Sequence, residues 1–91
     1  MIPTKHRHVK WKKTGSTGVL LNLVSGDYYE LDGTAIAIWN AIDGRTPVAG
    51  IVRKIATAYR VAPKTVEKDV TSFLAALHKR TLIQSIGGHG L

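Results

Sequence analysis

The chain has 91 residues, of which 44% are hydrophobic and 21% charged, so it has the length and composition of one globular domain. No apolar stretch approaches the ~18 residues of a membrane span, and the N-terminus lacks the apolar segment of a signal peptide. The absence of cysteine excludes disulfides and thiolate metal sites and is compatible with a cytoplasmic protein, while the formal net charge of +7 raises the question of an acidic partner.

The first third of the chain predicts three strands. Residues 8–13, HVKWKK, alternate apolar and basic side chains, as a half-buried strand does. This strand lies in the basic part of the chain, because the first thirteen residues hold five Lys or Arg and no acidic residue. Residues 19–24, VLLNLV, predict a strand that is apolar on both faces, and the SGD turn at 25–27 leads into a short third strand at 28–31, YYEL. We therefore expect an antiparallel meander with residues 28–31 at one edge.

From residue 32 onward the apolar spacing becomes helical. A first helix is expected after Asp32 or Thr34 as the N-cap, with Gly44 at its C-terminal end, and a second from an N-cap at Thr46 with proline next. Pro63 opens a third helix that runs to about residue 81. Trp39, Tyr59 and Phe73 are expected in the core, as are Leu82 and Ile83.

Three strands followed by three helices predict an α+β fold of the winged helix-turn-helix type. We expect a single domain over residues 1–84 and a flexible C-terminal tail over residues 85–91, where glycines surround a single histidine.

No pattern in the sequence indicates catalysis. The acidic residues Asp27, Asp32 and Asp43 adjoin glycines at turns or helix ends, and Glu67 and Asp69 point in different directions on one helix. His6 and His8 have no third ligand nearby for a metal, and the GSTG segment lacks the ending of a phosphate-binding loop. We therefore expect a binding module with no cofactor and no metal.

Two binding functions fit a winged helix. Its third helix can enter the DNA major groove, but here Glu67 and Asp69 occupy the middle of that helix and would repel phosphates. Alternatively, the edge strand at 28–31 can accept an extended peptide as a further strand, with side chains entering pockets beside the third helix. This strand contains neither proline nor lysine, the residues that commonly protect an exposed edge.

Three consecutive stretches resemble a known family: GVLLNLVSGDYYELDGTAIAIWNAIDG (18–44), TPVAGIVRKIATAY (46–59) and VEKDVTSFLAALHKRTLI (66–83). They resemble the PqqD-like RiPP recognition element family, and most closely its stand-alone leader-peptide-binding members of lasso-peptide biosynthesis. The resemblance covers about residues 9 to 84. Two positions depart from the family pattern: Thr81 stands where glycine is frequent, and Asp32 where asparagine is common.

The resemblance implies a non-catalytic adaptor of the cytoplasm, within antibiotic biosynthesis, that binds the leader of a ribosomally made precursor peptide and acts as its chaperone. The leader would add to the edge strand and lie against the third helix, and the adaptor would deliver it to a leader peptidase, a transglutaminase-like cysteine protease, and a macrolactam cyclase. The alternatives are a winged-helix DNA-binding protein and the peptide chaperone of quinone-cofactor (PQQ) biosynthesis. The implied leader-binding residues are Asp27, Tyr28, Tyr29, Glu30, Leu31, Val66, Asp69, Val70, Phe73 and Ala76.

Overall fold

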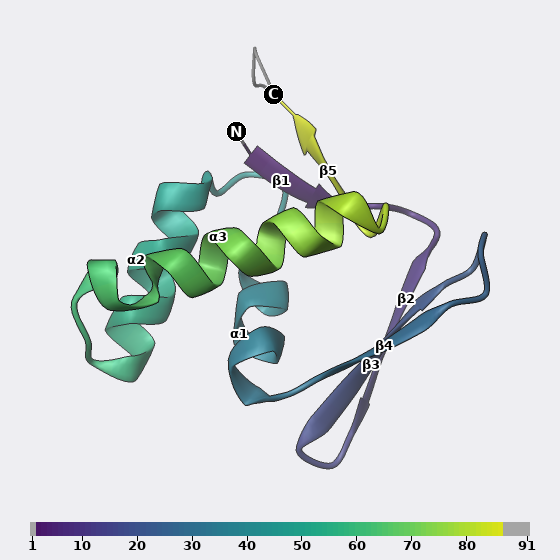
Figure 1. Ribbon diagram of the computed structural model, residues 1–91, viewed down its shortest axis with the longest axis horizontal. Helices are drawn as coiled ribbons and strands as arrows, with labels where there is room; N and C mark the ends of the chain where they lie inside the picture. The colour runs from purple at the N-terminus through teal and green to yellow at the C-terminus, as the bar shows by residue number, and fades with distance from the viewer. Residues whose placement is uncertain (1, 87–91) are drawn as a thin grey trace.

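The computed structural model describes residues 2–86, and its first feature is a three-stranded antiparallel sheet. The strands β2 (Val9–Thr14), β3 (Thr17–Asn22) and β4 (Tyr28–Leu31) follow one another in the sheet in chain order, which leaves β4 at an edge (Figure 1). Gly26 takes a φ of 81° in the turn before β4, and buried Asn22 accepts hydrogen bonds there from the N–H groups of Val24 and Ser25. The predicted meander is confirmed, but β3 ends at Asn22, so Leu23 and Val24, which the sequence placed in the strand, lie in the turn and are exposed.

Three helices follow the sheet: α1 (Gly33–Ala41), α2 (Val48–Tyr59) and α3 (Pro63–Lys79). They gather beside the sheet, with α3 crossing the middle of the molecule in Figure 1. The Asp32 carboxylate caps α1 by accepting a hydrogen bond from the Ala35 N–H, as expected. Pro63 occupies the first turn of α3, where its missing N–H costs no hydrogen bond. The fold is α+β with a winged helix-turn-helix arrangement, as the sequence predicted.

Two further strands, β1 (Ile2–Lys5) and β5 (Ile83–Ile86), pair antiparallel in a separate two-stranded sheet. The sequence did not predict β1, and β5 includes Ser85 and Ile86, which the sequence had placed in the tail. Residues 87–91, the remainder of the expected tail, lie outside the described part of the chain. The two ends of the described chain therefore lie side by side (Figure 1), and neither covers β4.

The core lies where β3, β4, β5 and the three helices meet. Trp39 is 2% exposed, and Leu82 and Ile83 are buried, as expected. Tyr59 is 46% exposed, so its prediction as a core residue is wrong. It is the last residue of α2, and the buried part of that helix ends at Ala56, so the predicted apolar stripe extends one turn beyond the core.

Two predicted helix ends differ in detail from the structure. The N-cap of α2 is Pro47 and not Thr46, because the Asp43 carboxylate accepts hydrogen bonds from the Thr46 hydroxyl and the Thr46 N–H. Gly44, with a φ of 76°, lies in that same turn, two residues beyond the C-cap Ile42. The backbone N–H groups of Arg45 and Thr46 hold the pKa of Asp43 down to about 2. Asp43 therefore has the structural role that its place beside a glycine indicated.

Candidate functional site

The outer edge of β4 presents main-chain groups to solvent. The Asn22 N–H donates to the Asp27 carbonyl at 2.8 Å, and pairs in an antiparallel ladder alternate between hydrogen-bonded and non-hydrogen-bonded. The register of β3 and β4 therefore directs the N–H and C=O groups of Tyr29 and Leu31 toward β3. Those of Tyr28 and Glu30 point outward, and within residues 2–86 no strand pairs with them.

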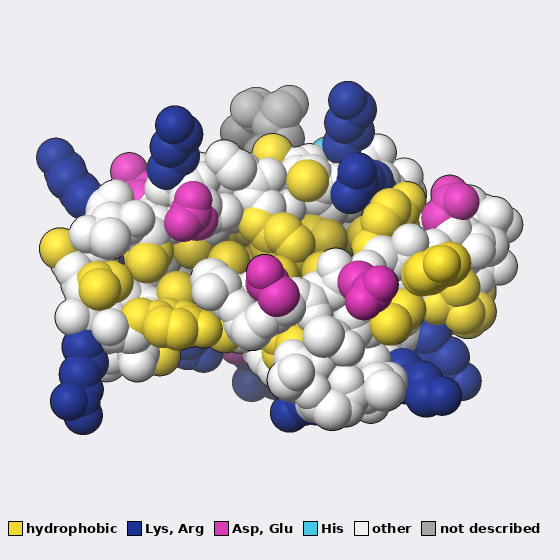
Figure 2. All heavy atoms as spheres, turned by 60° about the horizontal axis from the view of Figure 1, so that its bottom comes forward, with side chains coloured by type: hydrophobic (Ala, Val, Ile, Leu, Met, Phe, Trp, Pro, Cys, Tyr) yellow, Lys and Arg dark blue, Asp and Glu magenta, His cyan; other side chains and the backbone are white. Residues whose placement is uncertain are grey.

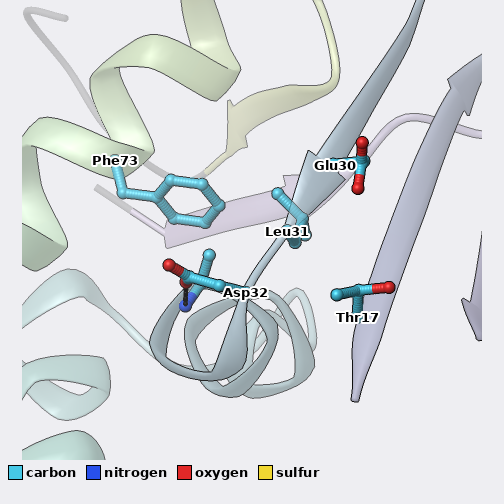
Figure 3. A pocket seen from close by; sticks show the side chains of 6 residues that line it. Thr17, Glu30, Leu31, Asp32 and Phe73 are labelled. Atoms are coloured by element: carbon cyan, nitrogen blue, oxygen red, sulfur yellow. Dashed lines mark hydrogen bonds between the residues drawn. The ribbon is translucent and has the colours of Figure 1, made fainter. Parts of the chain in front are cut away.

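Three hollows lie along this edge on its α3 side, and together we call them the cleft. The hollow near the end of β4 is open, has a volume of about 300 Å³ and is lined by Leu31, Ala35 and Phe73 among others. The Phe73 ring reaches from α3 toward Leu31 and Asp32, whereas Glu30 lies on the other side of the strand (Figure 3). A second hollow of about 250 Å³ adjoins it and adds Asp69 and Ile38 to the lining. This end of the cleft has an aromatic and aliphatic floor.

The other end of the cleft lies beside the start of β4 and the C-terminus of α3. A hollow of about 320 Å³ there is lined by Asp27 and Tyr29 on one side and by Lys79 and Arg80 on the other. The Arg80 guanidinium stands 4.7 Å from the centre of the Tyr29 ring, in a cation–π contact. Arg80 therefore covers the inward-facing aromatic ring of the edge strand.

The space-filling view shows hydrophobic side chains gathered in a hollow across the middle of one face (Figure 2). Acidic side chains border this hollow, and basic side chains stand beyond it at the upper right of the view. An exposed apolar strip beside an unpaired strand is the surface that an extended peptide needs, because the main chain supplies hydrogen bonds and the strip accepts alternate side chains.

The two N-terminal histidines lie against each other. His6 and His8 stack with ring centres 4.7 Å apart, and burial lowers the pKa of His6, with His8 and His78 contributing in the same direction. A ring nitrogen of His8 lies 3.0 Å from the Thr81 carbonyl. Within residues 2–86 no group of three or more His, Cys, Asp or Glu side chains is placed to hold a metal ion. No helix in that same range is long and apolar enough to cross a membrane.

Comparison with protein families shows one family to which the chain is similar. Residues 17–83 match the family described as Coenzyme PQQ synthesis protein D (PqqD). The chain belongs to the PqqD family. Comparison with curated proteins gave no match.

Solved structures similar to this PqqD-family chain include complexes with peptides. TbiB1 in complex with the TbiA(β) leader peptide is 29% identical, with a TM-score of 0.81 over 93% of this chain and 99% of that one. The PqqD truncation of Methylobacterium extorquens PqqCD, described as a functional, stand-alone RiPP recognition element, is 26% identical over 91% and 88% of the two chains, with a TM-score of 0.76. Lasso peptide synthetase B1 complexed with a leader peptide shares the fold at 20% identity and a TM-score of 0.80, over 93% and 100% of the two chains.

The structure brings most of the sequence-predicted residues of this PqqD-family chain to the cleft, in different roles. Tyr28 offers main-chain groups, but its ring is 68% exposed and faces away from the cleft. Val70 is a residue of α3 that is fully buried in the core, so it cannot touch a ligand. Val66 and Ala76 are half-buried on α3 and line none of the hollows. The residues that line the cleft are Asp27, Tyr29, Glu30, Leu31, Asp69 and Phe73.

Several lining residues were not expected from the sequence. Lys79 and Arg80 lie at the end of α3, and His8 reaches the same hollow from just before β2. Asp32 and Ala35 belong to the start of α1, and Thr17 to the start of β3. The periodicity of α3 gave no sign of Arg80, because a residue just after a helix has no predictable direction.

A larger hollow of about 630 Å³ lies on the opposite face of the sheet in this PqqD-family chain. Lys10, Lys12, Val19, Leu21 and Tyr28 line it from the outward face of the three strands, and Trp11 and Thr14 of β2 complete the lining. None of these residues lines a hollow beside α3, so this hollow is separate from the cleft. This face combines apolar and basic side chains.

Proposed function

We propose that this protein is a non-catalytic adaptor that binds the leader of a ribosomally made precursor peptide, of the lasso-peptide type, by strand addition to β4. The observation that carries the proposal is the outward direction of the Tyr28 and Glu30 main-chain groups beside an apolar cleft. The leader-peptide complex of TbiB1, at 29% identity, supports it. An added strand would place alternate side chains over Leu31, Phe73 and Tyr29.

We further propose that the adaptor works in the cytoplasm and delivers the bound precursor to a leader peptidase of the transglutaminase-like cysteine protease type and to a macrolactam cyclase. The outer face of the sheet is the surface we assign to an enzyme partner. Lys10 and Lys12 lie on it with Val19 and Leu21, and it stays accessible when a peptide occupies the cleft. The chemistry would belong to the partner enzymes.

The family description favours a second candidate, the peptide chaperone of quinone-cofactor biosynthesis. Both candidates use a peptide ligand, so affinity for each precursor separates them. DNA binding has less support, because the exposed surface of α3 carries Glu67 and Asp69 among its basic residues.

The test is an NMR titration of isotope-labelled protein with the TbiA(β) leader peptide and with leaders encoded beside this protein's own gene. We expect the Tyr28 and Glu30 amides to shift and to gain protection from hydrogen exchange, because they acquire hydrogen-bond partners. The Tyr29 and Leu31 amides are bonded to β3 in the free protein and should change little in protection. A scrambled leader serves as the control. The proposal would be contradicted if no leader bound, or if the amide chemical shifts changed only in elements other than β4.

A further inference from the structure

The two ends of the cleft carry opposite charge. Near the end of β4, Glu30, Asp32 and Asp69 line the two adjoining hollows, and no Lys or Arg lines either of them. At the other end the hollow is lined by Lys79 and Arg80 with His8, and Asp27 is the single acidic residue there. A ligand lying along the cleft therefore meets negative potential at one end and net positive potential at the other.

These charges are available to a ligand. The Arg80 guanidinium contacts the Tyr29 ring, which does not neutralise its charge. Asp69 is exposed on α3, and Glu30 is exposed on the edge strand itself. Asp32 uses one carboxylate oxygen to cap α1, at 3.3 Å from the Ala35 nitrogen, which leaves the other oxygen free to accept a ligand group.

The two ends are within reach of one short peptide. Strand β4 has four residues, and at about 3.3 Å per residue it separates the ends by about 13 Å. An extended segment of about four to six residues spans that length. One bound segment therefore contacts the charged residues at both ends of the cleft.

Main-chain pairing alone does not fix the direction of an added strand, because a peptide can pair with the Tyr28 and Glu30 groups in a parallel or an antiparallel sense. Side chains must make that choice. Reversing a peptide with one basic and one acidic end would place each charge against its like, which is unfavourable at close range.

We propose that the cleft selects leader segments by the order of their charges, and that this order sets the direction of binding. The preferred segment places a Lys or Arg beside Asp32 and Asp69 and an Asp or Glu beside Lys79 and Arg80. Apolar side chains between them enter the hollow at Phe73. This inference rests on the proposed function and adds the chemical class of peptide that the cleft accepts.

The test is a selection from a display library of random dodecapeptides. The wild-type protein is compared with the double variant Asp69→Lys/Arg80→Glu, which leaves neither end of the cleft with a net positive charge and keeps the net charge of the protein unchanged. The matched control is Lys64→Glu/Glu67→Lys, an equivalent exchange on exposed α3 residues that line none of the hollows. Circular dichroism melting curves establish that both variants fold.

We expect wild type and control to enrich peptides with opposite charges about four residues apart, in one order. The Asp69→Lys/Arg80→Glu variant should enrich no preferred order. A selected peptide and its charge-reversed isomer should differ in Kd by about tenfold at low salt and by less at high salt.

Each other outcome has a defined meaning. Peptides that protect the Tyr28 and Glu30 amides but show no charge order with the wild-type protein, or an order that the double variant retains, overturn this inference and leave the adaptor function standing. Peptides that bind without protecting those amides, or a library that yields no binder, contradict strand addition itself, and the inference falls with it.

Discussion

Thr81 is held in a backbone conformation that its side chain disfavours. It has a φ of 60°, in the left-handed region, where a β-branched residue is an outlier. The position turns the chain at the end of α3 so that Leu82 and Ile83 enter the core. Glycine would adopt this conformation without a steric penalty.

We predict that Thr81→Gly stabilises the protein. Relief of the strain contributes about 1 kcal/mol, partly offset by the greater freedom of glycine in the unfolded chain. The thermal midpoint should rise by a few degrees. Thr71→Gly, in the interior of α3, is the control and should lower the midpoint. A fall in the midpoint for Thr81→Gly would show that the hydroxyl or methyl group compensates for the strain.

Phe73 is the aromatic residue that we expect to contribute most to peptide affinity. Its ring is half-buried and lines both hollows at the end of β4. Phe73→Ala should weaken leader binding by about 2 kcal/mol, or roughly thirtyfold in Kd, measured by calorimetric titration below the melting transition. Tyr59→Ala removes an exposed ring at the end of α2 and should leave Kd unchanged. Equal losses in the two variants would argue against a specific role for Phe73.

At the scale of single elements, β4 divides its side chains and its main chain between two tasks. Tyr29 and Leu31 direct their side chains inward and their main-chain groups toward β3. Tyr28 and Glu30 direct their side chains outward and their main-chain groups toward the open edge. The sequence predicted the side-chain alternation, because a strand has a period of two residues. The direction of the main-chain groups could not be predicted in this way. It depends on how β3 and β4 are aligned across the turn before β4, and no residue pattern specifies that alignment.

This division makes a proline test possible. Glu30→Pro removes an outward N–H that takes no part in pairing with β3, so the fold should persist, since proline is tolerated where an edge strand faces solvent. Leader affinity should fall sharply, because one hydrogen bond is lost and the pyrrolidine ring stands in the path of the added strand. Glu30→Ala keeps the N–H and separates the loss of the hydrogen bond from the loss of the carboxylate. Normal leader affinity in a folded Glu30→Pro protein would contradict strand addition.

The helices and the meander could be predicted from sequence because each carries its own periodic pattern. The pair of β1 and β5 could not, since each strand has four residues and β1 contains Pro3. Their pairing joins Ile2 to Ile86, across almost the whole chain. Such a contact depends on the docking of all the elements between them.

At the scale of the whole molecule, the cleft results from how α3 is set against the sheet. Its floor was predicted in part, through Phe73, Tyr29 and Leu31, because apolar residues on facing elements tend to meet. The charged ends of the cleft were not predicted. Arg80 comes just after α3 and Asp32 just before α1, and only the packing of these helices brings both residues beside β4.

The β1–β5 sheet should contribute to stability without contributing to the cleft. Ile83 is 1% exposed and belongs to β5, and it lines none of the cleft hollows. Ile83→Val should lower the free energy of unfolding by about 0.5–1.5 kcal/mol, measured by urea denaturation, with Kd for the leader unchanged. A changed Kd at a temperature where the variant is fully folded would show that the two parts are coupled.

The pairing of Ile2 with Ile86 brings two distant points of the polypeptide to about 5 Å from each other. A host protein could therefore accept residues 2–86 as an insertion in one of its surface loops without opening that loop, and a circularly permuted version would need only a short bridge. In either form β4, which pairs with neither β1 nor β5, would keep its outer edge unpaired.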